Sequence, residues 1–285
     1  QFEPPRDVTT ANNLLNLSTR AFVGTETGVL IGGFILQGTA SSTMVIRAIG
    51  PSLTAAGVSD ALEDPFLEIY NSAGTLLFSN DNWQTGSDAA SIQAAGLAPD
   101  SPLEAAVRVM LPPGTYTALV RGVGDSTVMG GMQPGLTGVG LVELYDLQLG
   151  ENRAANLSTR GNILPADGVM IAGCIIGGSE AKELILRALG PSLQDHGVGD
   201  AVGDPQLQVV SADGVVLAAN DDWEDDADAA IIASSGLGPE SPLEAAVHVI
   251  LPPGLYTAIA SPAPQDSGVG LIELYDLTPF PSVLH

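Results

Sequence analysis

The chain contains few of the residues on which redox, nucleic-acid-binding and membrane proteins depend. Cysteine occurs once in 285 residues, at Cys174 in the apolar run VMIAGCIIGG, which excludes a disulfide framework and favours a buried, inert thiol. Lysine and arginine total 9 against 33 aspartates and glutamates, a formal net charge of −24. Such a surface repels nucleic acid and anionic lipid and attracts cations. No apolar run reaches the roughly 20 residues of a membrane-spanning helix.

Histidine is also scarce, and its placement argues against hydrolytic catalysis. The three histidines are His196, His248 and His285, so the first half of the chain has none. The segment Gly124-Asp125-Ser126 resembles the nucleophile motif of serine proteases. A serine nucleophile needs a histidine base beside it, so we predict that the chain is not an enzyme.

One unit is present twice in the chain. The stretch SPLEAAVRVMLPPGTYTA at position 101 returns as SPLEAAVHVILPPGLYTA at position 241, an offset of 140 (241 − 101). The same offset relates RAIGPSL to RALGPSL, NDNW to NDDW, and NLSTR to its second copy. A constant offset over about a hundred residues indicates a duplicated structural unit. We expect an N-terminal arm (1–15), repeat 1 (16–147), a linker (148–155), repeat 2 (156–277) and a C-terminal tail (278–285).

Short apolar runs separated by turn residues predict an all-β fold. In repeat 1 the runs lie at 28–36, 42–50, 66–70, 75–79, 105–111, 115–120 and 139–147. Only brief helical pieces are expected, at 52–56 and 89–95. This pattern, with 34 glycines and 20 prolines, is typical of antiparallel β-sandwiches, and we predict two of them in tandem. The predicted core includes Ile31, Val45, Ile69, Val107, Tyr116 and Leu141 with their repeat 2 counterparts.

Three segments carry a family resemblance. The stretches DPFLEIYNSAGTLLFSNDNW, LPPGTYTALVRG and VGLVELYDL resemble bacterial pre-peptidase C-terminal domains, which share a DP strand, a hairpin, an acidic loop and a PGTYT strand pair. Through RAIGPSL and NDNW, both repeats resemble tandem repeats of secreted surface proteins of verrucomicrobia-like bacteria. The resemblance implies jelly-roll-like, non-catalytic domains.

Four of the nine basic residues are duplicated at matching positions. They are Arg20, Arg47, Arg160 and Arg187. In so acidic a chain we expect each guanidinium to bind a carboxylate or loop carbonyls, which is a structural role. The natural partners are Glu143 and Glu273, or Asp146 and Asp276.

The polar loops 80–88 and 220–228 are the best ligand candidates. Calcium takes six to eight oxygen ligands, and the candidate ligands are Asp221, Asp222, Asp226 and Asp228 in repeat 2 and, as a poorer set, Asp81 and Asp88 in repeat 1. Alternatively, these side chains only cap turns and the following helix. Trp83 and Trp223 either stack on a sugar or close the edge of the core. One functional hypothesis is therefore a calcium-dependent binding module with a glycan partner.

The two ends of the chain suggest self-assembly. Extended, proline-containing, partly apolar segments suit docking on a neighbour, and the residues expected to dock are Phe2, Pro4, Pro5, Leu14, Leu15, Phe280, Val283 and Leu284. We expect the contact between the two repeats to be heterologous. The unused face of each repeat would then be equivalent to the face that the other repeat uses in this contact, so copies could join head to tail into an open homopolymer. The alternative is that each end packs on its own domain and the protein is monomeric.

A start at Gln1, without an initiator methionine or a signal-peptide pattern, indicates a processed, exported protein. The leading hypothesis is a non-catalytic extracellular subunit of a bacterial surface filament.

Overall fold

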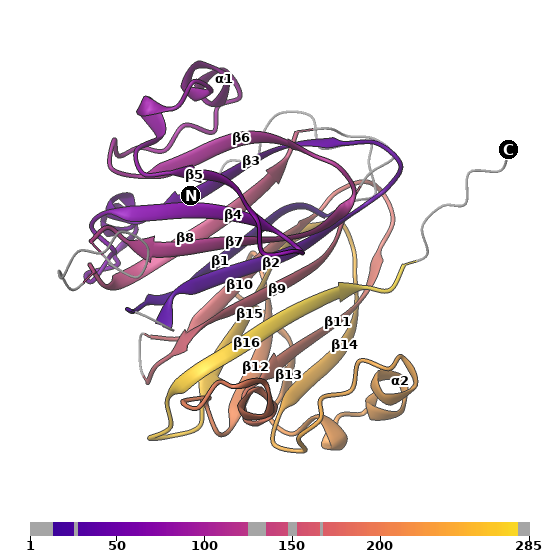
Figure 1. Cartoon of the computed structure of the whole chain (residues 1–285). Helices are drawn as coiled ribbons and strands as arrows, with labels where there is room; N and C mark the ends of the chain where they lie inside the picture. Colours follow the sequence, from indigo (N-terminus) through magenta and orange to yellow (C-terminus); the bar gives the residue numbers. More distant parts are fainter. Residues whose placement is uncertain (1–13, 26–27, 125–134, 148–152, 166–167, 279–285) are drawn as a thin grey trace, which may run out of the picture.

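The computed structural model describes residues 14–25, 28–124, 135–147, 153–165 and 168–278, and strands make up most of them (Figure 1). Repeat 1 contains β1 (Leu14–Val23), β2 (Leu30–Gln37), β3 (Ser42–Ile49), β4 (Pro65–Asn71), β5 (Leu76–Asn80), β6 (Ala105–Leu111), β7 (Gly114–Gly122) and β8 (Gly138–Asp146). Repeat 2 contains β9 (Arg153–Ile163), β10 (Met170–Ile176), β11 (Lys182–Leu189), β12 (Pro205–Ser211), β13 (Val216–Asn220), β14 (Ala245–Leu251), β15 (Gly254–Pro262) and β16 (Gly268–Asp276).

Helical elements are short and occur at equivalent places in the two repeats. They are η2 (Pro51–Ala56), η3 (Trp83–Thr85) and α1 (Ala89–Ala94), then η4 (Pro191–His196), η5 (Trp223–Asp225) and α2 (Ala229–Ser234). Among the described residues, no helix is both long and apolar enough to cross a membrane. The strands β1 and β9 begin inside the expected arm and linker, so those two boundaries were placed too late.

Each repeat folds as a jelly roll with two layers of four strands. In repeat 1 one layer has the order β1-β8-β3-β6 and the other β2-β7-β4-β5. Repeat 2 has the matching orders β9-β16-β11-β14 and β10-β15-β12-β13. Two interleaved Greek keys of this kind define the jelly roll, and the predicted all-β fold of two tandem jelly-roll-like sandwiches is confirmed.

The two jelly rolls share both sheets. Strand β1 pairs with β8 of its own repeat on one side and with β10 of repeat 2 on the other, so that Leu17 lies opposite both Leu144 and Cys174. Strand β9 likewise lies between β16 and β2. Sheet I therefore runs β6-β3-β8-β1-β10-β15-β12-β13, and sheet II runs β14-β11-β16-β9-β2-β7-β4-β5. In Figure 1, β5 and β6 lie towards one end of the molecule and β13 and β14 towards the other.

The contact between the repeats pairs equivalent residues. Thr19 and Thr159, which differ by the repeat offset of 140 (159 − 19), have hydroxyl oxygens 2.7 Å apart. A parallel bridge between β1 and β9 joins Phe22 to Asn162, which are also equivalents. Such a contact is isologous, as in a twofold dimer. The expectation of a heterologous contact is wrong, because each repeat offers the same two strands to the other.

One hydrophobic core extends through both repeats. A single buried cluster includes Phe34 and Leu67 of repeat 1 together with Leu186 and Leu207 of repeat 2. The molecule is therefore one continuous two-layer sandwich rather than two separate cores joined by a linker.

The predicted core residues are partly correct. Ile69, Val107 and Tyr116 belong to the shared core, whereas Val45 is buried in a separate cluster that includes α1. Ile31 and Leu141 are only half-buried. Successive side chains of a strand point to opposite faces of the sheet. In β2 and β8 the inward side chains are therefore those of Leu30 and Val142, the neighbours of Ile31 and Leu141, and both are fully buried.

Candidate functional site

A buried glutamate that sequence reasoning did not identify joins the most strongly duplicated motifs. Glu104 of SPLEAA is fully buried, and its carboxylate accepts hydrogen bonds from the backbone N–H groups of Gly50, Ser52 and Ser101 at 2.9–3.1 Å. The Ser52 hydroxyl also donates to it, at 2.5 Å. Glu244 makes the same four bonds in repeat 2. In each repeat three of these four hydrogen bonds join the GPSL motif to the SPLE motif, which is a structural role.

Two of the duplicated arginines lie in matching ion-pair clusters. Arg47 pairs with Glu143, donates to the Leu97 carbonyl at 3.0 Å, and lies over the Tyr145 ring, 5.1 Å from its centroid. The matching cluster of repeat 2 comprises Arg187, Glu273, Leu237 and Tyr275. Burial and then the neighbouring Glu273 raise the pKa of Tyr275 to about 12, so this phenol stays protonated at neutral pH. The clusters fasten the loops after α1 and α2 to the sheets.

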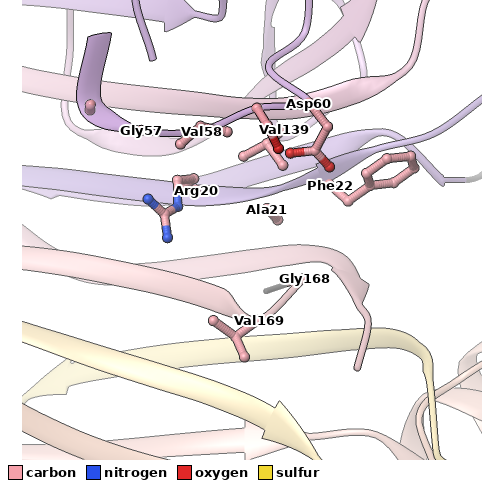
Figure 2. Close-up of a pocket in the computed structure, with 11 residues that line it drawn as sticks. Arg20, Ala21, Phe22, Gly57, Val58, Asp60, Val139, Gly168 and Val169 are labelled. Carbon is pink, nitrogen blue, oxygen red and sulfur yellow. The ribbon is translucent and has the colours of Figure 1, made fainter. Parts of the chain in front are cut away.

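The other two duplicated arginines behave differently. Arg20 lies in a pocket of about 300 Å³ at the repeat junction (Figure 2), lined by β1, by the turn Gly57–Asp60 and by Gly168 and Val169 of repeat 2. No ion pair between described residues includes Arg20 or Arg160. The Nε atom of Arg160 is buried without a hydrogen-bond partner in the described part of the chain. Among the described residues, the predicted binding of these two arginines to a carboxylate or to loop carbonyls is therefore not seen.

The loop 80–88 covers the outer edge of sheet I. The side-chain oxygen of Asn80 accepts a hydrogen bond from the Ala106 N–H at 3.0 Å, and the Asp88 carboxylate accepts one from the Arg108 N–H. The counterpart of Asn80 in repeat 2 makes the same bond, also at 3.0 Å. Unpaired N–H groups on an edge strand are open to pairing with another chain. Here the side chains of Asn80 and of the candidate calcium ligand Asp88 bind those N–H groups instead.

The aspartates of the loop 220–228 do not converge on one point. One oxygen of Asp226 accepts from the Asp228 N–H at 2.8 Å, and Asp228 lies 3.0 Å from the Nδ1 atom of His248. In the described part of the chain, no group of three or more histidine, cysteine, aspartate or glutamate side chains is placed to hold a metal ion. The structure thus does not bring Asp222, Asp226 and Asp228 together, because a turn and a histidine engage two of them.

Two aspartates of repeat 1, one of them in the loop 80–88, each have a carboxylate oxygen without a hydrogen-bond donor in the part of the chain that the structure describes. Asp64 precedes β4 and Asp81 follows β5, and the Oδ1 atom of each is buried without a hydrogen-bond donor among the described residues. Burial and then the charge of Asp81 raise the pKa of Asp64. Asp204, the counterpart of Asp64, also has a buried Oδ1 without a donor. Burial comes first among the causes that raise its pKa, followed by the charges of Asp221, Asp222 and Asp266.

Trp83 and Cys174 are interior residues. Trp83 is buried beside α1, and its indole N–H donates to the Ser101 carbonyl at 3.1 Å, so it closes the edge of the core. Burial raises the pKa of the Cys174 thiol to about 12, which makes it unreactive at neutral pH.

The end residues predicted to mediate assembly lie outside the described part of the chain or have side chains that are not described. They are Phe2, Pro4, Pro5, Leu14, Leu15, Phe280, Val283 and Leu284. Ser126 of the protease-like motif also lies outside the described residues.

Comparisons with known proteins add little to this picture. No protein-family model matches the chain, and no curated protein does. Similar solved structures include the major capsid protein of Sulfolobus turreted icosahedral virus (STIV), 14% identical over 96% of this chain and 90% of that chain, with a TM-score of 0.22. The CUB1-EGF-CUB2 domain of human MASP-1/3 is 9% identical over 96% of this chain and 97% of that chain, with a TM-score of 0.21. Likeness at this level carries no functional argument.

Proposed function

We propose that the protein is a non-catalytic, extracellular structural subunit that assembles with copies of itself. The observation that carries this proposal is the continuity of both sheets and of the core from one end of the molecule to the other. A continuous sandwich resists bending between its halves, as a building block requires. The buried clusters around Glu104 and Arg47 have structural roles that agree with this function. The resemblance to secreted surface proteins supports an extracellular location.

The charge of the chain sets the conditions for assembly. A net charge of −24 makes two copies repel each other at low ionic strength, and salt screens that repulsion within about 8–10 Å at 0.10–0.15 M. Assembly is therefore expected to increase with ionic strength.

The test is to measure the size of the purified full-length protein over a range of concentrations. Light scattering and negative-stain microscopy at low salt, at moderate salt, and with calcium or EDTA should show particles larger than one chain that grow with concentration and salt. A protein that stays monomeric at high concentration in every one of these buffers would rule out the proposal.

A second candidate function is a calcium-dependent binding module. The donorless Oδ1 atoms of Asp64, Asp81 and Asp204 favour it, because a divalent cation with backbone carbonyls and water could satisfy these oxygens. Calorimetry with calcium on the wild type and on Asp64→Asn and Asp204→Asn variants tests it, with Asp226→Asn as a control in the loop 220–228. A lower binding heat in the first two variants alone supports the proposal, since each of them removes one of two equivalent sites. Equal heats in all four proteins, or none in the wild type, would reject it.

A further inference from the structure

Each of the two sheets ends in a short strand with one open side. Sheet II ends in β5 and sheet I ends in β13. Among the described strands, β5 pairs only with β4 and β13 only with β12. We infer that copies of the protein join edge to edge through these strands, so that β5 of one copy pairs with β13 of the next. The inference rests on the proposed self-assembly and names the surface that carries it.

The sheet edges differ in how they are protected. The outer edges of β6 and β14 are covered by side chains of the loops 80–88 and 220–228, which accept hydrogen bonds from the backbone N–H groups of Ala106, Arg108 and Ala246. No comparable cover lies on β5 or β13 within the described residues. Natural proteins usually protect sheet edges against pairing with other chains. This chain covers one edge of each repeat with side chains, whereas the other edge, in the described ranges, is protected only by its short length and by a bulge.

The two open strands are also uncharged and apolar on the outside. Strand β5 has the sequence LLFSN and β13 has VLAAN, without a charged residue in either. Leu76 is 46% exposed and its counterpart Val216 is 51% exposed, and the adjacent Leu77 and Leu217 are exposed as well. Two copies with a net charge of −24 repel each other, and because an uncharged strand adds nothing to that repulsion, a second copy can approach it more easily than a charged edge. A bulge between Ile69 and Tyr70 interrupts the β4–β5 ladder, so the pairing segment is short.

The positions of the two edges identify the occupant as a second copy. Strands β5 and β13 are equivalents, and they lie at opposite ends of the path through the sheets. Pairing β5 of one copy with β13 of the next would join sheet II of the first copy to sheet I of the second. Each copy offers one edge at either end, so the contact leaves a free edge after every addition and gives an open chain.

The first experiment introduces a negative charge into one edge at a time in the full chain. Leu76→Glu changes β5 and Val216→Glu changes β13, both at exposed positions where folding should be unaffected. Met110→Glu and Ile250→Glu are matched controls, because these equivalent residues on β6 and β14 are 68% and 65% exposed. Light scattering should show at least a tenfold loss of large particles for the two edge variants and wild-type assembly for the two controls. Leu77→Glu and Leu217→Glu serve as a second pair if circular dichroism shows that either edge variant is misfolded.

The second experiment mixes the two edge variants. If β5 pairs with β13, each variant alone is a monomer, and the mixture forms dimers that do not grow, because only one intact pair of edges remains. Dimers of a single variant would show that like edges pair, and would overturn the inference. Wild-type assembly by both edge variants would also overturn it while leaving the proposed self-assembly intact. A wild type that never assembles would defeat the proposed function itself.

Discussion

Thr19 and Thr159 share one hydrogen bond at the centre of the molecule. Their hydroxyl oxygens are 2.7 Å apart, both side chains are buried, and either can be the donor. The two residues are equivalents in the repeat, so the bond lies on the approximate twofold axis that relates the two jelly rolls. The contact between the repeats is therefore self-complementary, with the same residue on each side.

Valine in place of either threonine should destabilise the protein more than valine in place of both. Thr19→Val leaves the Thr159 hydroxyl buried without a partner, which costs about 1–3 kcal/mol in the free energy of unfolding. The double variant removes both polar groups at nearly constant shape and should lie within about 1 kcal/mol of the wild type. Urea unfolding of the four proteins measures this. Strictly additive effects would show that the hydroxyl groups do not interact.

Arg47 should be needed for stability because of the charge that it neutralises. Arg47→Met leaves the buried Glu143 without its cation, and such a loss typically costs about 3–5 kcal/mol. Adding Glu143→Gln should restore part of that stability, since the unpaired charge is gone. Arg108→Met is the control, because this side chain is exposed and surface changes usually stay within about 0.5 kcal/mol. Thermal melts compare the variants, and equal losses for Arg47→Met and Arg108→Met would contradict the proposed role.

His248 should make repeat 2 more stable at mildly acidic pH. Its ring nitrogens lie 3.0 Å from Asp228 and 3.1 Å from Glu183. Burial opposes protonation, but the hydrogen bonds to Asp228 and Glu183 outweigh it and raise the pKa of His248. Because the pKa in the folded state lies above the unfolded value of about 6.5, the stabilisation is complete below that pH and is lost as pH rises through the folded pKa.

The measurement for His248 is the melting temperature of the wild type and of His248→Gln between pH 5.5 and pH 9, where the range is chosen to span about 6.5. The wild type should exceed the variant most at the acidic end, and the difference should shrink with rising pH. His196→Gln is the control, since that residue is exposed on η4. A difference that does not vary with pH would show that His248 does not titrate in this range.

Cutting the linker should not separate the repeats. A protease site inserted within 148–152 would sever the only covalent connection between them, while the β1–β10 and β9–β2 ladders and the shared core remain. After cleavage, size-exclusion chromatography should show an unchanged mass, and denaturant should be needed to release the halves. Two separate peaks in native buffer would contradict the shared sheets.

The sequence predicted the strands inside each repeat better than the contact between them. The strand at 105–111 and the helical turn at 89–95 were placed within one residue, because apolar runs and turn residues mark them. The segment NLSTR was not identified as a strand, although it forms the centres of β1 and β9. The polar residues Asn16, Ser18 and Thr19 interrupt the alternation of apolar side chains that marks a strand. Thr19 is nevertheless buried, against its own equivalent rather than against apolar side chains.

The sequence predicted some of the residues at the candidate sites but missed others. The duplicated Arg47 and Arg187 do lie beside Glu143 and Glu273, because adjacent strands bring these four positions into register. The role of Glu104 could have been inferred from its duplication in an otherwise apolar stretch, but two of its donor residues, Gly50 and Ser52, are 54 and 52 residues away in the chain. Burial and then the charge of Asp81 raise the pKa of Asp64, and no local sequence pattern reveals either cause.

The pairing of β1 with β10 fixes the order in which the chain can be completed during synthesis. Leu17 lies opposite Cys174, so β1 gains its second neighbour only after 157 further residues (174 − 17) have been synthesised. At about 5–20 residues per second, β1 waits on the order of ten seconds after its own synthesis for β10, and during this time the edges of β1 and β2 are unfilled. Long-range pairing of this kind also slows folding. The first half is therefore most vulnerable to misassociation with neighbouring nascent chains, and that interval ends when residues 153–176 become available.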